Sequence, residues 1–241
     1  MEHLSAIPDA PGLQPTFLSV VIPVLHEENR INGTVRRVTA VCDRLPVEII
    51  VVDGDPQGST LSALDVQDVV SLLSAPGRAI QMNRGASRAA GEVILFLHAD
   101  TLLPAHADSL IAACLLDPLS VGGCFDLGID SSRWYFRITE RYVACRTRIT
   151  RVPFGDQAIF LRRAYFERIG GFREIPLMED VELMARIRKR GDRIAVLPEK
   201  ALTSARRWER EGVLRATTRN WMLQCLYCAG VPPEELAKYY R

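Results

Sequence analysis

The sequence lacks any run of about 18 consecutive apolar residues, the shortest stretch expected of a membrane-spanning helix. Its first 16 residues are polar and rich in proline, without the basic segment followed by an apolar segment that is typical of a signal peptide. We therefore expect a cytoplasmic protein without an integral membrane segment, in which residues 1–16 form a flexible arm.

An excess of charge of either sign is also missing. The 30 lysines and arginines face 29 aspartates and glutamates, which leaves a formal net charge of +1. Proteins that bind nucleic acid through its phosphates usually carry a basic surplus. The charge balance therefore predicts no nucleic-acid partner.

Three signatures of common cofactor sites are absent. Cys225 and Cys228 form a CxxC without a second pair or a nearby histidine, whereas a zinc site needs about four ligands. The pattern GxGxxG does not follow the first predicted strand, and GxxxxGK[ST] does not occur. These absences predict reduced cysteines without zinc, and they exclude the dinucleotide fingerprint and the P-loop.

The composition and the hydrophobic pattern indicate an α/β protein. The chain has 241 residues, of which 48% are hydrophobic and 24% charged, enough for one large domain. Apolar runs predict buried strands, and helical periodicity predicts helices between them. The expected strands are 17–24, 48–53, 68–75 and 92–100, with helices at 28–43 and within 77–90. This alternation predicts a Rossmann-like, doubly wound, mostly parallel sheet with helices on both faces.

The pattern loosens after residue 104. Strands are expected at 120–128, 157–161 and 193–197, and helices at 106–116, 131–149, 162–169 and 179–190, before a helical segment at 205–241. We find no repeat and no linker. The economical prediction is a single domain over 17–241, with halves at about 17–104 and 105–241.

Acidic residues follow three of the predicted strands. They are Glu27 and Glu28, then Asp53 and Asp55, then Asp100. In an open parallel sheet, ligands bind beyond the carboxyl ends of the strands. Carboxylates gathered there repel one another unless a cation or ligand compensates them. The sequence therefore suggests a nucleotide whose diphosphate is screened by a divalent metal.

The same segments resemble inverting glycosyltransferase family 2, which has the GT-A fold. The matching stretches are VVIPVLHEE, EIIVVDGDPQGST, GRAIQMNRGASRAAGEVILFLHADT, PFGDQAIFLRRAYFERIGGF and PLMEDVELMARIRKRG. The C-terminal segment is similar to a small soluble bacterial subfamily without transmembrane helices. The resemblance covers residues 17–241, with the nucleotide-binding half first and the acceptor half second.

The resemblance implies a role for each matching residue. The nucleotide-sugar donor would meet Glu27, Asp53, Arg78, Asn83, His98 and Asp100, and Asp100 would also hold Mn²⁺ or Mg²⁺. Asp180 would be the catalytic base, with Glu179 beside it. The acceptor side would comprise Gly155, Asp156, Gln157, Arg206, Arg207 and Trp208. The chain departs from the family at His98, where an aspartate is usual, and at His26, where an asparagine is usual.

The implied reaction is a single displacement of hexosyl-transferase type. Asp180 would deprotonate an acceptor hydroxyl as it attacks the anomeric carbon, so the configuration inverts. The acceptor itself is not identified. Two alternatives stay open: a sugar-phosphate nucleotidyltransferase, and a non-catalytic subunit that binds nucleotide sugars.

Structural roles compete with these assignments. From pattern alone, Asp180 is more often a helix cap than a base. The apolar residues Trp221, Leu223, Leu226 and Tyr227 favour core packing, but the pattern leaves peripheral contact with a membrane open.

Overall fold

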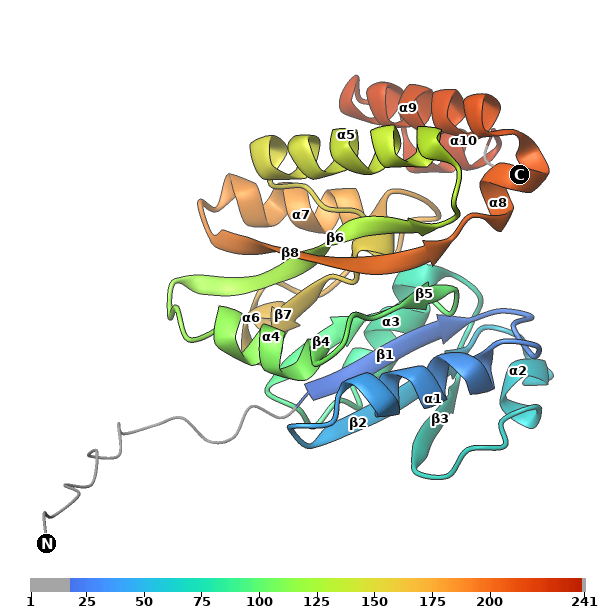
Figure 1. Cartoon of the computed structure of the whole chain (residues 1–241), viewed down its shortest axis with the longest axis vertical. Helices are drawn as coiled ribbons and strands as arrows, with labels where there is room; N and C mark the ends of the chain where they lie inside the picture. The colour runs from blue at the N-terminus through green and yellow to red at the C-terminus, as the bar shows by residue number, and fades with distance from the viewer. Residues whose placement is uncertain (1–17, 240–241) are drawn as a thin grey trace, which may run out of the picture.

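The computed structural model describes residues 18–239, apart from the side chains of residues 207, 210, 213, 214 and 217. The predicted arm at 1–16 lies outside the described part. Eight strands form one sheet in the order β3-β2-β1-β4-β7-β6-β8-β5 (Figure 1). The strands are β1 (Leu18–Val24), β2 (Val47–Asp53), β3 (Val69–Leu73), β4 (Val93–Phe96), β5 (Thr101–Leu102), β6 (Ser120–Asp130), β7 (Phe160–Arg162) and β8 (Arg193–Ser204).

Helices connect and cover these strands. They are α1 (Ile31–Val41), α2 (Ser59–Ser62), α3 (Arg78–Ala86), α4 (Ala107–Cys114), α5 (Trp134–Thr150), α6 (Arg163–Arg168), α7 (Glu179–Lys189), α8 (Arg206–Glu211), α9 (Val213–Cys228) and α10 (Pro233–Ala237), with a 3₁₀ turn η1 (Gly155–Gln157). Within residues 18–239, no helix combines the length and the apolar character that crossing a bilayer requires.

Strands β3, β2, β1 and β4 pair with one another in parallel, and helices cover both faces of this part of the sheet. All seven residues of β1 are buried, as expected for a central strand with both faces covered. One core packs α1 and α4 against the sheet, and a second packs α3, α6 and α7 against the other face. The predicted α/β class with helices on both faces is confirmed.

The remaining strands make the sheet mixed. Strand β7 is antiparallel to both β4 and β6, and β5 is antiparallel to β8, whereas β6 and β8 are parallel. Four of the seven strand pairs are therefore parallel. A Cβ on Gly122 of β6 would stand 2.9 Å from the Leu161 Cα and closer still to the Phe160 carbonyl oxygen. Only glycine lets β6 and β7 approach this closely.

Strand β8 is longer than the 193–197 predicted from the sequence. The predicted strand ends just before Pro198, a residue that has no N–H to donate to a neighbouring strand. In the structure, the pairing with β6 continues to Ser204, with a register shift that leaves Pro198 and Glu199 unpaired with β6. This irregularity carries the strand past the proline and delivers Thr203 and Ser204 to the site described below.

The cysteines are free thiols, and Cys225 and Cys228 are both exposed on α9. Among the described residues, no group of three or more histidine, cysteine or acidic side chains is arranged as a metal site by itself.

Candidate active site

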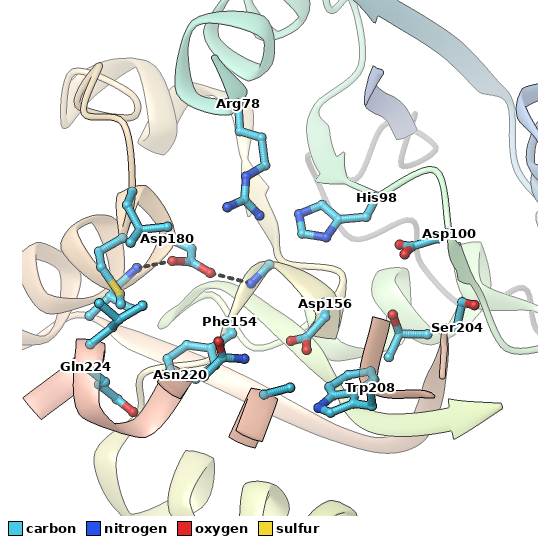
Figure 2. A pocket seen from close by; sticks show the side chains of 17 residues that line it. Arg78, His98, Asp100, Phe154, Asp156, Asp180, Ser204, Trp208, Asn220 and Gln224 are labelled. Atoms are coloured by element: carbon cyan, nitrogen blue, oxygen red, sulfur yellow. Dashed lines mark hydrogen bonds between the residues drawn. The ribbon is translucent and has the colours of Figure 1, made fainter. Parts of the chain in front are cut away.

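A cavity of about 180 Å³ lies beyond the carboxyl end of β4. Its walls come from both halves of the chain (Figure 2). It is lined by Arg78, His98, Asp100, Phe154, Gly155, Asp156, Leu177, Met178, Asp180, Val181, Thr203, Ser204, Trp208, Ala216, Asn220, Leu223 and Gln224. The three carboxylates in this set come from separate parts of the fold: the segment after β4, η1 and the start of α7.

Asp180 is held firmly at the N-terminus of α7. Its Oδ2 accepts a hydrogen bond from the Gly155 N–H at 2.6 Å, and its Oδ1 accepts one from the Val181 N–H at 2.7 Å. Met178, just before the helix, has a left-handed backbone with φ of 67°, which is uncommon for a residue other than glycine. The local backbone therefore fixes the direction of the Asp180 carboxylate, which still has lone pairs available to a ligand.

The Asp156 carboxyl is strongly affected by its surroundings. Burial raises its pKa to about 6, Arg146 opposes that change, and the charges of Asp180 and Asp100 reinforce it. Its buried Oδ1 has no hydrogen-bond partner. The Arg146 guanidinium lies over the Phe154 ring at 3.7 Å from the centroid, close enough to affect this carboxyl. The cavity thus contains an acid that a cationic or hydrogen-donating ligand would stabilise.

His98 and Asp100 follow β4. Burial, assisted by the charge of Arg78, lowers the pKa of His98 to about 3, so the imidazole is neutral at physiological pH. A Cβ on Gly155 would come within 2.7 Å of the His98 Nε2, so this glycine allows η1 to approach the imidazole. Asp100 lines the cavity. Burial raises the pKa of Glu27, Arg30 opposes the change, and the nearby charge of Asp100 adds to it.

Arg78 begins α3 and connects the cavity to Glu179. Its Nε lies 3.1 Å from the Glu179 Oε1, and the glutamate side chain is almost fully buried. Burial raises the pKa of Glu179, while Arg78 opposes the change and Asp180 adds to it. Glu179 does not line the cavity, so its observed contact is with Arg78 rather than with the cavity space.

Four of the residues assigned by resemblance have their polar groups engaged with other residues of the protein. Asp53 accepts N–H groups from Asp55, Thr60 and Leu61. The Asn83 amide donates to the Phe172 carbonyl and accepts the Phe172 N–H. The buried Gln157 amide donates to the Phe125 carbonyl and accepts hydrogen bonds from Thr147 and the Phe154 N–H. The Glu27 carboxylate lies 3.8 Å from Arg30. None of the four lines the cavity.

The C-terminal segment closes the cavity on another side. Trp208 lines it, whereas the exposed Arg206 donates from its Nε to the Ser204 hydroxyl. The side chain of Arg207 lies outside the described part of the structure.

Sequence reasoning missed the polar wall that α9 provides. Asn220 and Gln224 line the cavity together with Ser204 (Figure 2). No motif marks these residues, and the apolar residues around them predict a core-packing helix. A spacing of four residues places two polar side chains on one helix face, and this is the only available signal.

The chain is similar to known glycosyltransferases in sequence and in fold. A model of the family described as "Glycosyl transferase family 2" matches residues 19–173, and no match was found among curated proteins. The chain is similar to the mannosyltransferase PcManGT from Pyrobaculum calidifontis, solved with GDP-Man and Mn²⁺, at 21% identity and a TM-score of 0.56. It is also similar to S. aureus TarS 1–349 in complex with UDP-GlcNAc, at 18% identity and a TM-score of 0.60.

The two solved structures match most of this chain but only part of their own length. The alignments cover 84% and 78% of this chain, but 60% and 58% of those two chains, so this chain spans less than two thirds of their length. At such identities the likeness shows the fold, which is of the GT-A type. The family match covers well over half of the 241 residues. The chain therefore belongs to glycosyl transferase family 2.

Proposed function

We propose that this protein transfers a sugar from a nucleoside-diphosphate sugar to an acceptor hydroxyl, with inversion at the anomeric carbon. The observation that carries the proposal is the convergence of Asp100, Asp156 and Asp180 on one cavity beyond β4. The family match and the GT-A fold support the reaction class.

Asp180 is the proposed general base. Two backbone N–H groups hold its carboxylate, and the remaining lone pairs can accept the proton of an acceptor hydroxyl. The hydroxyl oxygen then forms the new bond to the anomeric carbon as the bond to the diphosphate oxygen breaks. The two bonds lie on opposite faces of the sugar, which inverts the configuration.

A divalent cation fits the oxygen-rich side of the cavity. Asp100 offers a hard carboxylate ligand, and Asp156 has a buried oxygen without a partner. The described residues do not form a complete protein cage, which agrees with the way Mg²⁺ is usually held by one or two carboxylates plus substrate phosphates. When bound, such an ion would neutralise charge on the departing diphosphate.

Arg78 and His98 are proposed to meet the donor. Arg78 carries a permanent positive charge, which would stabilise the leaving diphosphate. Its ion pair with Glu179 fixes the guanidinium in place, so Glu179 acts as a positioning residue. The neutral His98 imidazole offers one hydrogen-bond donor and one acceptor to the sugar nucleotide, and it has no positive charge that would repel a cation.

Glu27 and Asp53 are proposed to form the nucleoside end of the donor site. Because Asp53 holds the N–H groups of Thr60 and Leu61, it would act by shaping the loop after β2. Asn83 and Gln157 are proposed to hold backbone segments of the fold without contacting the donor or the acceptor. Trp208 and Arg206, with the α9 wall, would lie toward the acceptor.

The first test is calorimetry of GDP and UDP, each with and without Mn²⁺, on the wild type and on Asp100→Ala. We expect one nucleotide to bind only with metal, and its affinity to fall at least about tenfold in the variant. Asp65→Asn, an exposed acid remote from the cavity, is the matched control and should bind as the wild type does.

The second stage separates catalysis from binding. Asp180→Asn should retain nucleotide binding while transfer falls by about 10²- to 10⁴-fold. The anomeric configuration of the product, read by NMR, tests inversion. Retained transfer in Asp180→Asn would reject this base, and transfer of a nucleotidyl group instead of a sugar would support the nucleotidyltransferase alternative.

A further inference from the structure

An apolar strip crosses the outer surface of α5. Trp134, Ile138, Tyr142 and Ile149 are all exposed, and Trp134 and Ile149 keep 73% and 77% of their surface accessible. At 3.6 residues per turn, these four side chains fall within one narrow arc of the helix. The opposite side of α5 packs inward through Phe136, Val143 and Thr147. Helix α5 therefore has two apolar sides, one packed against the protein core and one exposed.

Helix α9 widens this surface. The Trp221 indole N–H donates to the Tyr142 hydroxyl at 2.6 Å, and both rings are largely exposed. The neighbouring Met222 is 49% exposed. Figure 1 shows α5 and α9 together at the end of the molecule opposite α1 and α2. We call this surface, formed by Trp134, Ile138, Tyr142, Ile149, Trp221 and Met222, the α5–α9 face.

Basic side chains outnumber acidic ones on the two helices of the face. Helix α5 carries four arginines, at 137, 141, 146 and 148, and its single acid, Glu140, is buried and paired with Lys200 and Arg137. Helix α9 contains arginines and no acid. Arg141 and Arg148 are exposed along one edge of the apolar strip, and the Arg148 guanidinium also holds both carboxylate oxygens of the buried Asp126 at 2.8 Å. Arg141 is therefore the exposed arginine of this edge that we assign to lipid. An apolar strip with tryptophan and a basic border is typical of helices that lie in the interface of an anionic membrane.

A second copy of the chain fits the face less well. In a two-fold contact, each copy would present the same arginines and no exposed acid from α5 or α9. Like charges would then meet around the apolar centre, and such an arrangement opposes association. An anionic surface compensates the same arginines.

The face adjoins the candidate active site through α9. Asn220, Leu223 and Gln224 line the cavity, while Trp221 and Met222, on other sides of the same helix, are exposed. A bilayer in contact with the α5–α9 face would therefore lie beside a wall of the cavity.

We propose that the α5–α9 face docks the protein on an anionic lipid surface. Aromatic and aliphatic side chains enter the headgroup region, and Arg141 contacts lipid phosphates. This binding does not depend on the proposed sugar transfer, and it is measured without any donor or acceptor.

Vesicle flotation of the full chain tests the proposal. The vesicles contain phosphatidylcholine alone or phosphatidylcholine mixed with phosphatidylglycerol. We expect the wild type to bind the mixed vesicles, to bind neutral vesicles far less, and to dissociate as salt is raised.

Surface variants locate the binding face. Replacing Trp134, Ile138 and Ile149 together by serine should reduce binding more than about tenfold, because three exposed apolar groups no longer enter the lipid. Leu116→Ser combined with Leu119→Ser removes equally exposed leucines elsewhere and should bind as the wild type does. Arg141→Glu should weaken binding about fivefold or more, whereas Arg88→Glu, an exposed arginine after α3, should not.

Circular dichroism checks that each variant folds, and light scattering measures its mass. The proposal is overturned if wild-type protein does not bind mixed vesicles, or if it binds them no better than neutral ones. It is also overturned if the triple serine variant binds as tightly as the wild type, or if the face holds together a dimer that this variant separates.

Discussion

The carboxyl group of Asp156 stays in a site that favours its neutral form. Its pKa is about 6 in the folded protein and 3.8 in an unfolded chain, so the folded state binds more protons between these values. The free energy of unfolding therefore falls as pH rises from about 3.8 to about 6. Above this range the folded protein keeps the full cost of holding an ionised, buried carboxylate. A ligand cation would remove this cost.

The Asp156→Asn substitution should remove the cost of ionising residue 156 without any ligand. Relative to the wild type, the variant should gain about 2 kcal/mol of unfolding free energy between pH 4 and pH 7.5, because asparagine does not ionise. Urea unfolding at the two pH values measures this difference. A gain that is the same at both pH values would contradict the assigned environment of Asp156.

The Asn83 side chain provides a second test at the residue scale. Its amide exchanges two hydrogen bonds with the backbone of Phe172. An aspartate in its place can accept but cannot donate, so Asn83→Asp should cost about 1–3 kcal/mol of unfolding free energy while nucleotide affinity stays unchanged. Chemical unfolding and calorimetry measure the two effects. Lost affinity with unchanged stability would show instead that Asn83 contacts the donor.

The sequence predicts the position of some site residues in the fold better than it predicts their contacts. Asp100 and His98 were placed at the tip of a strand because their position follows from the apolar run before them. Gln157 was assigned to the acceptor side, yet its amide is buried against backbone groups. A motif reports where a residue lies along the chain, whereas its hydrogen-bond partners come from segments distant in sequence.

At the scale of elements, the close contact of β6 with β7 is a sensitive point. Gly122→Ala forces a Cβ against backbone atoms of Phe160 and Leu161, so we expect a loss of about 2 kcal/mol or more in unfolding free energy. Gly33→Ala is the matched control, because a Cβ there meets nothing within 4 Å on α1. Urea denaturation should show the control as stable as the wild type or more so. Equal stability of both variants would mean that the strands can separate at little cost.

Elements in the first half were easier to predict than those in the second. Continuous apolar runs marked β1, β2 and β4 because these strands are buried on both faces. Strand β8 alternates between buried and exposed residues and contains Pro198, so its full length was missed. Short elements such as α2 and β5 depend on tertiary contacts and leave no periodic signal.

At the scale of the whole molecule, the sheet is continuous across both halves. Antiparallel pairing of β4 with β7 joins the predicted nucleotide-binding half to the acceptor half. The alternation of strands and helices predicted the parallel part, but the pairing of β7 between β4 and β6 could not be read from the sequence. Residues of β4 and β7 that pair, such as Leu95 and Phe160, are distant in sequence, and no local pattern encodes their pairing.

The cavity wall formed by α9 can change independently of the rest of the candidate site. The family match ends at residue 173, so Asn220, Leu223 and Gln224 belong to a part of the chain that the family pattern does not constrain. Substitutions there reshape the cavity without touching Asp100 or Asp156. Under the proposed function, substitutions in this one C-terminal helix would change which acceptors fit the cavity, while the carboxylates proposed to bind the metal stay in place.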